Sequence, residues 1–183
     1  MKCTSTEAET QFTLGSKYFD WQDFGGSRGL KDLADARRLY GLAAAQGHVG
    51  AQLILGSMHL YGAGGLNDFA EARRLLGLAA AQGQPNAQAT LGSMHHDGAG
   101  GPIDFAEARR LLGLAAAQGD AGAQVNLGSM HHEGEGGPTD FVEARRLFGL
   151  AAAQGNAEAQ LLLGSMQCVG KGASDEAPDI AEA

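Results

Sequence analysis

Residues 69–104 read FAEARRLLGLAAAQGQPNAQATLGSMHHDGAGGPID, and residues 105–140 repeat this stretch with changes at only eight of the 36 positions. The motif Ala-Ala-Ala-Gln-Gly recurs through the chain at a constant interval of 36 residues, and it ends at Gly47, Gly83, Gly119 and Gly155. A period of this length is typical of helix pairs that stack as a solenoid. The sequence therefore predicts an all-α protein built from about four to five helix-turn-helix repeats.

Local signals predict where the two helices of a unit begin and end. Asp68 is a candidate N-cap, and Glu71 follows it three residues later as in a capping box, so its carboxylate is expected to reach back to the cap. This first helix is expected to run to Gln82 and to end at the following glycine. The second helix is expected over about 85–96, and it also stops at a glycine.

Glycine recurs inside both helices, although each such residue costs about 1 kcal/mol relative to alanine. Because glycine lacks a Cβ, the repeated cost favours close approach of a packed helix, with approach of a ligand as the alternative. The positions are Gly41, Gly77, Gly113 and Gly149 in the first helix, and Gly56, Gly92, Gly128 and Gly164 in the second.

Composition and charge narrow the choice of partners and compartment. The 183 residues carry 13 basic and 21 acidic side chains, a net charge of −8, which argues against a nucleic-acid backbone or an anionic membrane surface as partner. No apolar run is long enough to span a membrane, and no signal peptide is visible. The two cysteines, Cys3 and Cys168, stand at opposite ends and suggest no disulfide framework. We therefore expect a cytoplasmic or otherwise reducing compartment and no direct membrane insertion.

The sequence contains no motif that predicts catalysis. It lacks a phosphate-binding loop, a Gly-x-Ser-x-Gly elbow and a His-Glu-x-x-His pair. The stretch from Ser93 to Asp97 holds serine, histidine and acid, but its duplication argues against a unique active site. Adjacent helical histidines point in different directions, so His95 and His131 are interpreted as packing residues rather than as metal ligands. We expect no enzymatic activity, no cofactor and no metal.

Paired arginines recur in the first helix of each unit. Glu71, Glu107 and Glu143 each stand three residues before the second arginine of a pair and should neutralise it. One arginine of each pair is expected to face solvent on a convex surface. The pairs are Arg37-Arg38, Arg73-Arg74, Arg109-Arg110 and Arg145-Arg146.

A set of spaced positions in each unit carries a family resemblance. One unit has Ala87-Gln88-x-x-Leu91-Gly92-x-Met94-x-x-x-Gly98-x-Gly100-Gly101-x-x-Asp104-x-x-x-Ala108. This pattern resembles the Sel-one-like repeat of the tetratricopeptide superfamily, and the resemblance covers nearly the whole chain. It implies a right-handed α-α superhelix. The chain departs from the family where an aromatic usually follows Leu-Gly, because His95 and His131 stand there.

We expect a single solenoid domain over residues 1–183. The irregular segment 21–30 interrupts the period, and its neighbourhood contains Phe19, Trp21 and Phe24, which are interpreted either as a contact surface or as a cap over the first helix. The expected units are 1–31, 32–67, 68–103, 104–139 and 140–173, with 174–183 as a partial or frayed next repeat.

The resemblance also implies a binding surface, since the Leu-Gly helix of related proteins lines the concave side of the superhelix. A mixed polar and apolar surface suits an extended peptide or a partner helix. We therefore expect a non-catalytic scaffold or adaptor, or a subunit of a larger assembly, that binds a protein or peptide. The candidate groove residues are Leu53, Ser57, Leu60, Tyr61, Ser93, His96, Asp97, Ser129, His132, Glu133 and Ser165.

Two alternatives remain open at this point. Some bacterial relatives resemble hydrolases of the β-lactam or peptidoglycan type, but those carry a cysteine pair in each repeat, which this chain lacks. The near-identical units also fit a purely architectural repeat array.

Overall fold

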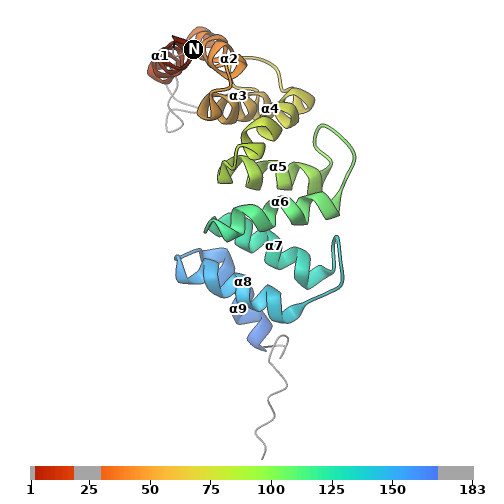
Figure 1. Cartoon of the computed structure of the whole chain (residues 1–183). Coiled ribbons are helices and arrows are strands. Elements are labelled where there is room, and N and C mark those ends of the chain that lie inside the picture. The colour runs from red at the N-terminus through yellow and green to blue at the C-terminus, as the bar shows by residue number, and fades with distance from the viewer. Residues whose placement is uncertain (1–2, 19–29, 169–183) are drawn as a thin grey trace, which may run out of the picture. The chain divides into compact units, whose positions relative to one another are not determined.

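The computed structural model describes residues 3–18 and 30–168, and this part of the chain is built from helices without strands (Figure 1). Two expectations, the aromatic segment around Trp21 and the partial repeat at 174–183, lie outside the described residues. The helices are α1 (Cys3–Tyr18), α2 (Leu30–Ala45), α3 (Val49–Tyr61), α4 (Phe69–Ala81), α5 (Pro85–Asp97), α6 (Phe105–Ala117), α7 (Ala121–Glu133), α8 (Phe141–Ala153) and α9 (Ala157–Cys168). This confirms the all-α prediction.

Two helix types alternate along the chain, in two compact units. The Leu-Gly helices are α1, α3, α5, α7 and α9, and the Arg-Arg helices are α2, α4, α6 and α8. The first unit covers Met1–Ile103 and the second Asp104–Ala183. Within each unit every described helix packs against the next one in the chain. In Figure 1, for example, α7 and α8 lie side by side and are joined by a long loop.

The predicted N-caps are confirmed, but the reciprocal half of the capping box is wrong. The side chain of Asp68 accepts a hydrogen bond from the backbone N–H of Glu71 at 3.0 Å, as expected. The carboxylate of Glu71 does not return to the cap, because Arg74 donates two hydrogen bonds to it at 2.7 Å. A charge-assisted, two-point contact outcompetes the neutral backbone N–H. The cap N–H of Asp68 instead donates to the carbonyl of His59 at 2.9 Å.

The helix ends agree with prediction to within one residue. Helix α4 ends at Ala81 with Gln82 as its C-cap, and α5 extends to Asp97 rather than His96. The glycines that follow adopt the left-handed conformation, with φ of 84° at Gly83 and 73° at Gly98. Glycine adopts that conformation without the steric cost that other residues incur.

Each unit has an alanine- and leucine-rich core with a large aromatic residue in it. In the first unit Tyr40 is buried, its ring centroid lies 5.7 Å from that of Phe12, and burial raises the pKa of its hydroxyl to about 12. In the second unit Phe148 is buried among Val125, Ala144, Ala151, Ala159 and Met166. Small alanines on facing helices leave the room that these rings fill.

Buried glutamines tie the helices together at one end of each pair. The amide nitrogen of Gln52 donates to the carbonyl of Ala44 at 3.3 Å, and its amide oxygen accepts from Gln82 at 2.7 Å. Gln124 repeats this arrangement in the second unit. Each buried amide thereby connects three consecutive helices, and its polar atoms are satisfied as burial requires.

The close-packing interpretation of the helix glycines is right for some positions and wrong for others. A Cβ on Gly56 would lie 2.8 Å from Leu76, and one on Gly128 would lie 2.6 Å from the ring of Phe148. In contrast, a Cβ would meet nothing within 4 Å at Gly41, Gly77, Gly113, Gly149 and Gly164. On the Arg-Arg helices these glycines adjoin half-exposed leucines such as Leu78. Their helix faces solvent there, so no neighbour requires a glycine.

The difference between Gly56 and Gly77 predicts opposite effects of alanine on stability. Replacing Gly77 with alanine should raise the free energy of unfolding by about 1 kcal/mol, because alanine makes the unfolded chain less flexible and nothing obstructs its methyl group in the helix. Replacing Gly56 with alanine should lower it, because Leu76 must move. Urea unfolding followed by circular dichroism measures both, and effects of the same sign would contradict the assignment.

Candidate functional site

The predicted groove residues of the first unit lie along one side of α3 and one side of α5. On α3, Leu53 and Leu60 are half-buried, Ser57 is only 9% exposed, and Tyr61 at the end of the helix is 57% exposed. The hydroxyl of Ser57 donates to the carbonyl of Leu53 at 3.0 Å. Tyr61 is therefore the most exposed of these four side chains on α3.

The continuation on α5 is polar. Ser93 and His96 are half-buried, and Asp97 is exposed. The Nδ1 atom of His96 lies 2.7 Å from a carboxylate oxygen of Asp97, while the hydroxyl of Ser93 donates to the carbonyl of Ala89 at 3.2 Å. A hydroxyl that donates to its own helix is turned toward the backbone, as is common for helical serines.

The second unit carries the remaining predicted residues on α7 and α9. Ser129 and His132 are half-buried, whereas Glu133 and Ser165 are exposed. The ring of His132 contacts the ring of Phe141 edge to face, with centroids 5.2 Å apart. The hydroxyl of Ser165 donates to the carbonyl of Leu162 at 2.7 Å. The helical spacing places Ser129, His132 and Glu133 on one side of α7.

Within residues 3–18 and 30–168, no three histidine, cysteine, aspartate or glutamate side chains are grouped closely enough to hold a metal ion. None of the helices described for this chain has the length and apolarity needed to cross a membrane.

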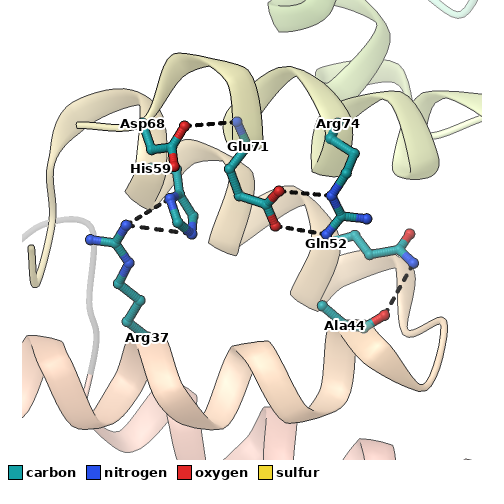
Figure 2. Close-up of polar contacts among 7 residues, drawn as sticks. All are labelled: Arg37, Ala44, Gln52, His59, Asp68, Glu71 and Arg74. Atoms are coloured by element: carbon teal, nitrogen blue, oxygen red, sulfur yellow. Dashed lines mark hydrogen bonds and ion pairs between the residues drawn. The ribbon is translucent and has the colours of Figure 1, made fainter. Parts of the chain in front are cut away.

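A contact that sequence reasoning missed joins the first arginine of a pair to a histidine 22 residues later. The Nη2 atom of Arg37 donates to Nδ1 of His59 at 2.6 Å (Figure 2). The same contact recurs at 2.5 Å between Arg73 and His95 and at 2.6 Å between Arg109 and His131. We call these three contacts the Arg–His clasps.

Each clasp lies beneath the glycine-rich loop that follows the Leu-Gly helix. The guanidinium of Arg37 also lies 3.4 Å from the carbonyl of Leu66 in that loop. A Cβ on Gly65 would collide with this guanidinium, and Gly101 and Gly137 stand in the same relation to Arg73 and Arg109. The clasp therefore holds both the histidine and the loop against the preceding Arg-Arg helix.

The electrostatics of the clasp keep the imidazole neutral. Burial and, after it, the charge of Arg37 lower the pKa of His59 below its usual 6.5. The same two causes, with Arg109 as the arginine, lower the pKa of His131. The guanidinium nitrogen of Arg37 lies 2.6 Å from Nδ1 of His59 and 3.4 Å from Nε2. Since an arginine can only donate, the nearer Nδ1 atom is assigned the lone pair and Nε2 the ring proton.

The second arginine of each pair behaves as predicted. Arg74 is exposed and paired with Glu71, and the hydrogen bond from Arg74 lowers the pKa of that carboxylate. Arg146 and Glu143 repeat the pair. The expectation that His95 and His131 are packing residues did not include their arginine partners, and the constant spacing of 22 residues was the available signal.

A hollow of about 450 Å³ opens on the second unit, away from the predicted residues. Gly113 of α6, Leu127 of α7 and Leu150 of α8 line it, and the ion pair of Glu143 and Arg146 also borders it. Its walls are mostly apolar or small.

The family model of the Sel1 repeat matches the chain at residues 8–48, 49–84, 85–120, 121–156 and 157–183. The chain belongs to the Sel1 repeat family. Each internal Sel1 repeat contains a Leu-Gly helix followed in sequence by an Arg-Arg helix, so that residues 49–84 hold α3 and α4. In this frame Arg37 and His59 belong to consecutive Sel1 repeats, and so do the partners in the other two clasps. The clasps are therefore contacts between repeats.

Two solved structures show the same fold. One is a protective antigen present in uropathogenic Escherichia coli strains displaying an SLR fold, with 37% identity, a TM-score of 0.82, and alignment over 93% of this chain and 36% of that one. The other is a Sel1 repeat protein from Oxalobacter formigenes, with 26% identity, a TM-score of 0.80, and coverage of 94% and 69% respectively. The chain thus spans about a third of the length of the Escherichia coli protein. No curated protein matches the chain significantly.

Proposed function

We propose that this chain is a non-catalytic interaction scaffold that binds a peptide or a helix of a partner protein along its Leu-Gly helices. On the first unit the proposed contact residues are the predicted ones of α3 and α5, and on the second unit they are those of α7 and α9. Sel1 repeat proteins generally serve as scaffolds for protein interactions, which supports this class of function.

The observation that carries the proposal is the exposure of large apolar side chains on helices whose other sides are well packed. Tyr61 is 57% exposed at the end of α3, and Leu161 is 76% exposed on α9. Between them in sequence, α5 and α7 present His96, Asp97 and Glu133. Aromatic and apolar anchors beside polar side chains are the usual composition of a protein-binding surface.

The experiment is an affinity capture from the source lysate with the intact chain, followed by quantitative binding of each captured protein in purified form. We expect the double variant His96→Glu, His132→Glu to weaken binding of a true partner at least tenfold, since it places two new negative charges on the surface. Circular dichroism should show unchanged helicity.

The matched control places the same charge on the other helix type. Leu78 on α4 and Leu114 on α6 are 43% and 42% exposed, and both helices are of the Arg-Arg type. Leu78→Glu, Leu114→Glu should leave binding intact. Loss of binding in this variant, with retention in the histidine variant, would assign the interaction to the Arg-Arg helices and overturn the proposal.

A further inference from the structure

The Arg–His clasps connect a titratable ring to a loop, and the connection is made at both ends of that loop. The ring of His59 accepts a hydrogen bond from Arg37, which also reaches the carbonyl of Leu66. The backbone carbonyl of the same histidine accepts from the N–H of Asp68, where the next helix begins. Residues 62–67 are therefore held between two bonds that meet at one histidine. Figure 2 shows the first of these bonds, between Arg37 and the ring of His59.

The second unit repeats this arrangement. The ring of His131 accepts from Arg109, whose guanidinium also lies 3.4 Å from the carbonyl of Pro138. The carbonyl of His131 accepts from the N–H of Asp140 at 2.8 Å. The loop at 134–139 is thus held as the loop at 62–67 is.

We propose that these two clasps form an acid-sensitive switch, in which protonation of His59 or His131 releases the adjoining glycine-rich loop while the helices remain folded. A proton on Nδ1 removes the lone pair that accepts the arginine bond. It also places two cations at the 2.6 Å separation that the bond now spans. The loop moves and the helices do not, because the guanidinium of Arg37 or Arg109 attaches the loop to the preceding helix.

The other charges around each ring do not reverse the lowering of its pKa. His59 faces Arg37 on α2 and Asp68, Glu71 and Arg74 from α4 and its cap. The acids favour the charged ring, but Glu71 already accepts two hydrogen bonds from Arg74. Burial and Arg37 outweigh them, and the pKa of His59 is lowered. His131 has the equivalent set, Arg109 on α6 with Asp140, Glu143 and Arg146.

The sign of the pH dependence follows from these directions. With a lowered pKa in the closed clasp and an ordinary value of 6.5 in the open one, the closed clasp binds fewer protons. Closure is fully favoured above pH 6.5, and it weakens as the pH falls through 6.5 toward the lowered pKa. Below both values, the population of open loop should be tenfold higher for each unit by which the pKa is lowered.

The chain itself supplies the matched variant. One repeat beyond His131, the sequence has Gln167 at the equivalent position. A glutamine offers a carbonyl oxygen to the arginine but does not titrate. His59→Gln and His131→Gln should therefore keep the loop closed and remove its pH response.

Nuclear magnetic resonance of the full-length, ¹⁵N-labelled chain between pH 8 and pH 5 tests the proposal. The amides of Gly64 and Gly65 should shift with the same midpoint as the ring of His59, below 6.5, and Gly136 and Gly137 should follow His131. Hydrogen exchange at these amides, corrected for intrinsic rates, should accelerate over the same range while helical amides stay protected.

The two loops serve as controls for each other. His59→Gln should abolish the shifts at Gly64 and Gly65 and leave those at Gly136 and Gly137 unchanged, and His131→Gln should do the reverse. The proposal is overturned if the wild-type histidines titrate while the loop amides stay still, or if the loop shifts persist in the glutamine variants. The wild-type titration decides the matter even if one variant fails to fold.

Discussion

Replacing Phe148 with alanine should lower the free energy of unfolding by about 3–5 kcal/mol, the range measured when a large core side chain is truncated. Phe148 is 2% exposed on α8 and packs against Val125, Ala159 and Met166 from α7 and α9. Its neighbours are small or are held in helices, so they cannot collapse into the space left by the ring. Urea unfolding followed by circular dichroism gives the change.

The matched control is Phe148→Leu. The equivalent positions of the two preceding repeats are Leu76 and Leu112, and both leucines are buried. The leucine variant should lose much less than the alanine variant, because leucine leaves a smaller cavity. If alanine and leucine lowered stability equally, the loss would not come from a cavity, and the packing described for this core would be wrong.

A second large effect is expected at Gly136, in the loop between α7 and α8. Its φ of 71° disfavours any side chain, and a Cβ there would collide with the backbone carbonyl of Phe105. A carbonyl within a helix cannot move aside as a flexible side chain can. Gly136→Ala should therefore cost about 3 kcal/mol or more, from left-handed backbone strain and overpacking together.

Gly155 separates the two causes. Its φ of 85° is equally unfavourable for alanine, but a Cβ there would meet nothing within 4 Å. Gly155→Ala should cost only about 1–2 kcal/mol, the strain alone. Thermal or urea unfolding of the two variants measures the difference. Equal losses at the two glycines would show that the loop does not approach α6 as closely as described.

The loop between α7 and α8 takes part in both the stability of the second unit and the contact of Arg109 with His131. The loop that carries Gly136 also carries Gly137, whose missing Cβ leaves room for the guanidinium of Arg109. A Gly136→Ala substitution should thus disturb the clasp of His131 as well as lower stability. We expect the pKa of His131 to move toward 6.5 in this variant, because an opened loop relieves both burial and the approach of Arg109.

Much of the fold could be predicted because its signals are local and repeated. The 36-residue period identified the helix pairs, and short-range chemistry identified their ends. Asp68 caps α4 through the N–H three residues away, and Gly98 ends α5 by adopting a left-handed conformation. Such interactions depend on residues close in sequence, so they can be recognised before the chain is folded. The pairing of Arg74 with Glu71 belongs to the same class.

The candidate site was less accessible to prediction. The side of each helix that carries Ser93, His96 and Asp97 follows from helical spacing, but the clasp beneath it does not. Arg37 and His59 lie on different helices, and nothing in the neighbourhood of either residue indicates the other. The constant interval between them carries the information only when it is read together with the geometry of helix packing.

Gly56 and Gly77 show most simply what could not be predicted from the sequence. Both are glycines inside helices of one repeated unit, and by sequence they carry the same cost in helix propensity. The tertiary structure alone decided that Gly56 lies against Leu76 while Gly77 faces open space. The period and the helix ends were determined by residues near each other in the chain. Which glycine, arginine or histidine meets a neighbour was determined by packing between helices, because such contacts depend on the distance between backbones that the chain reaches only when it is folded.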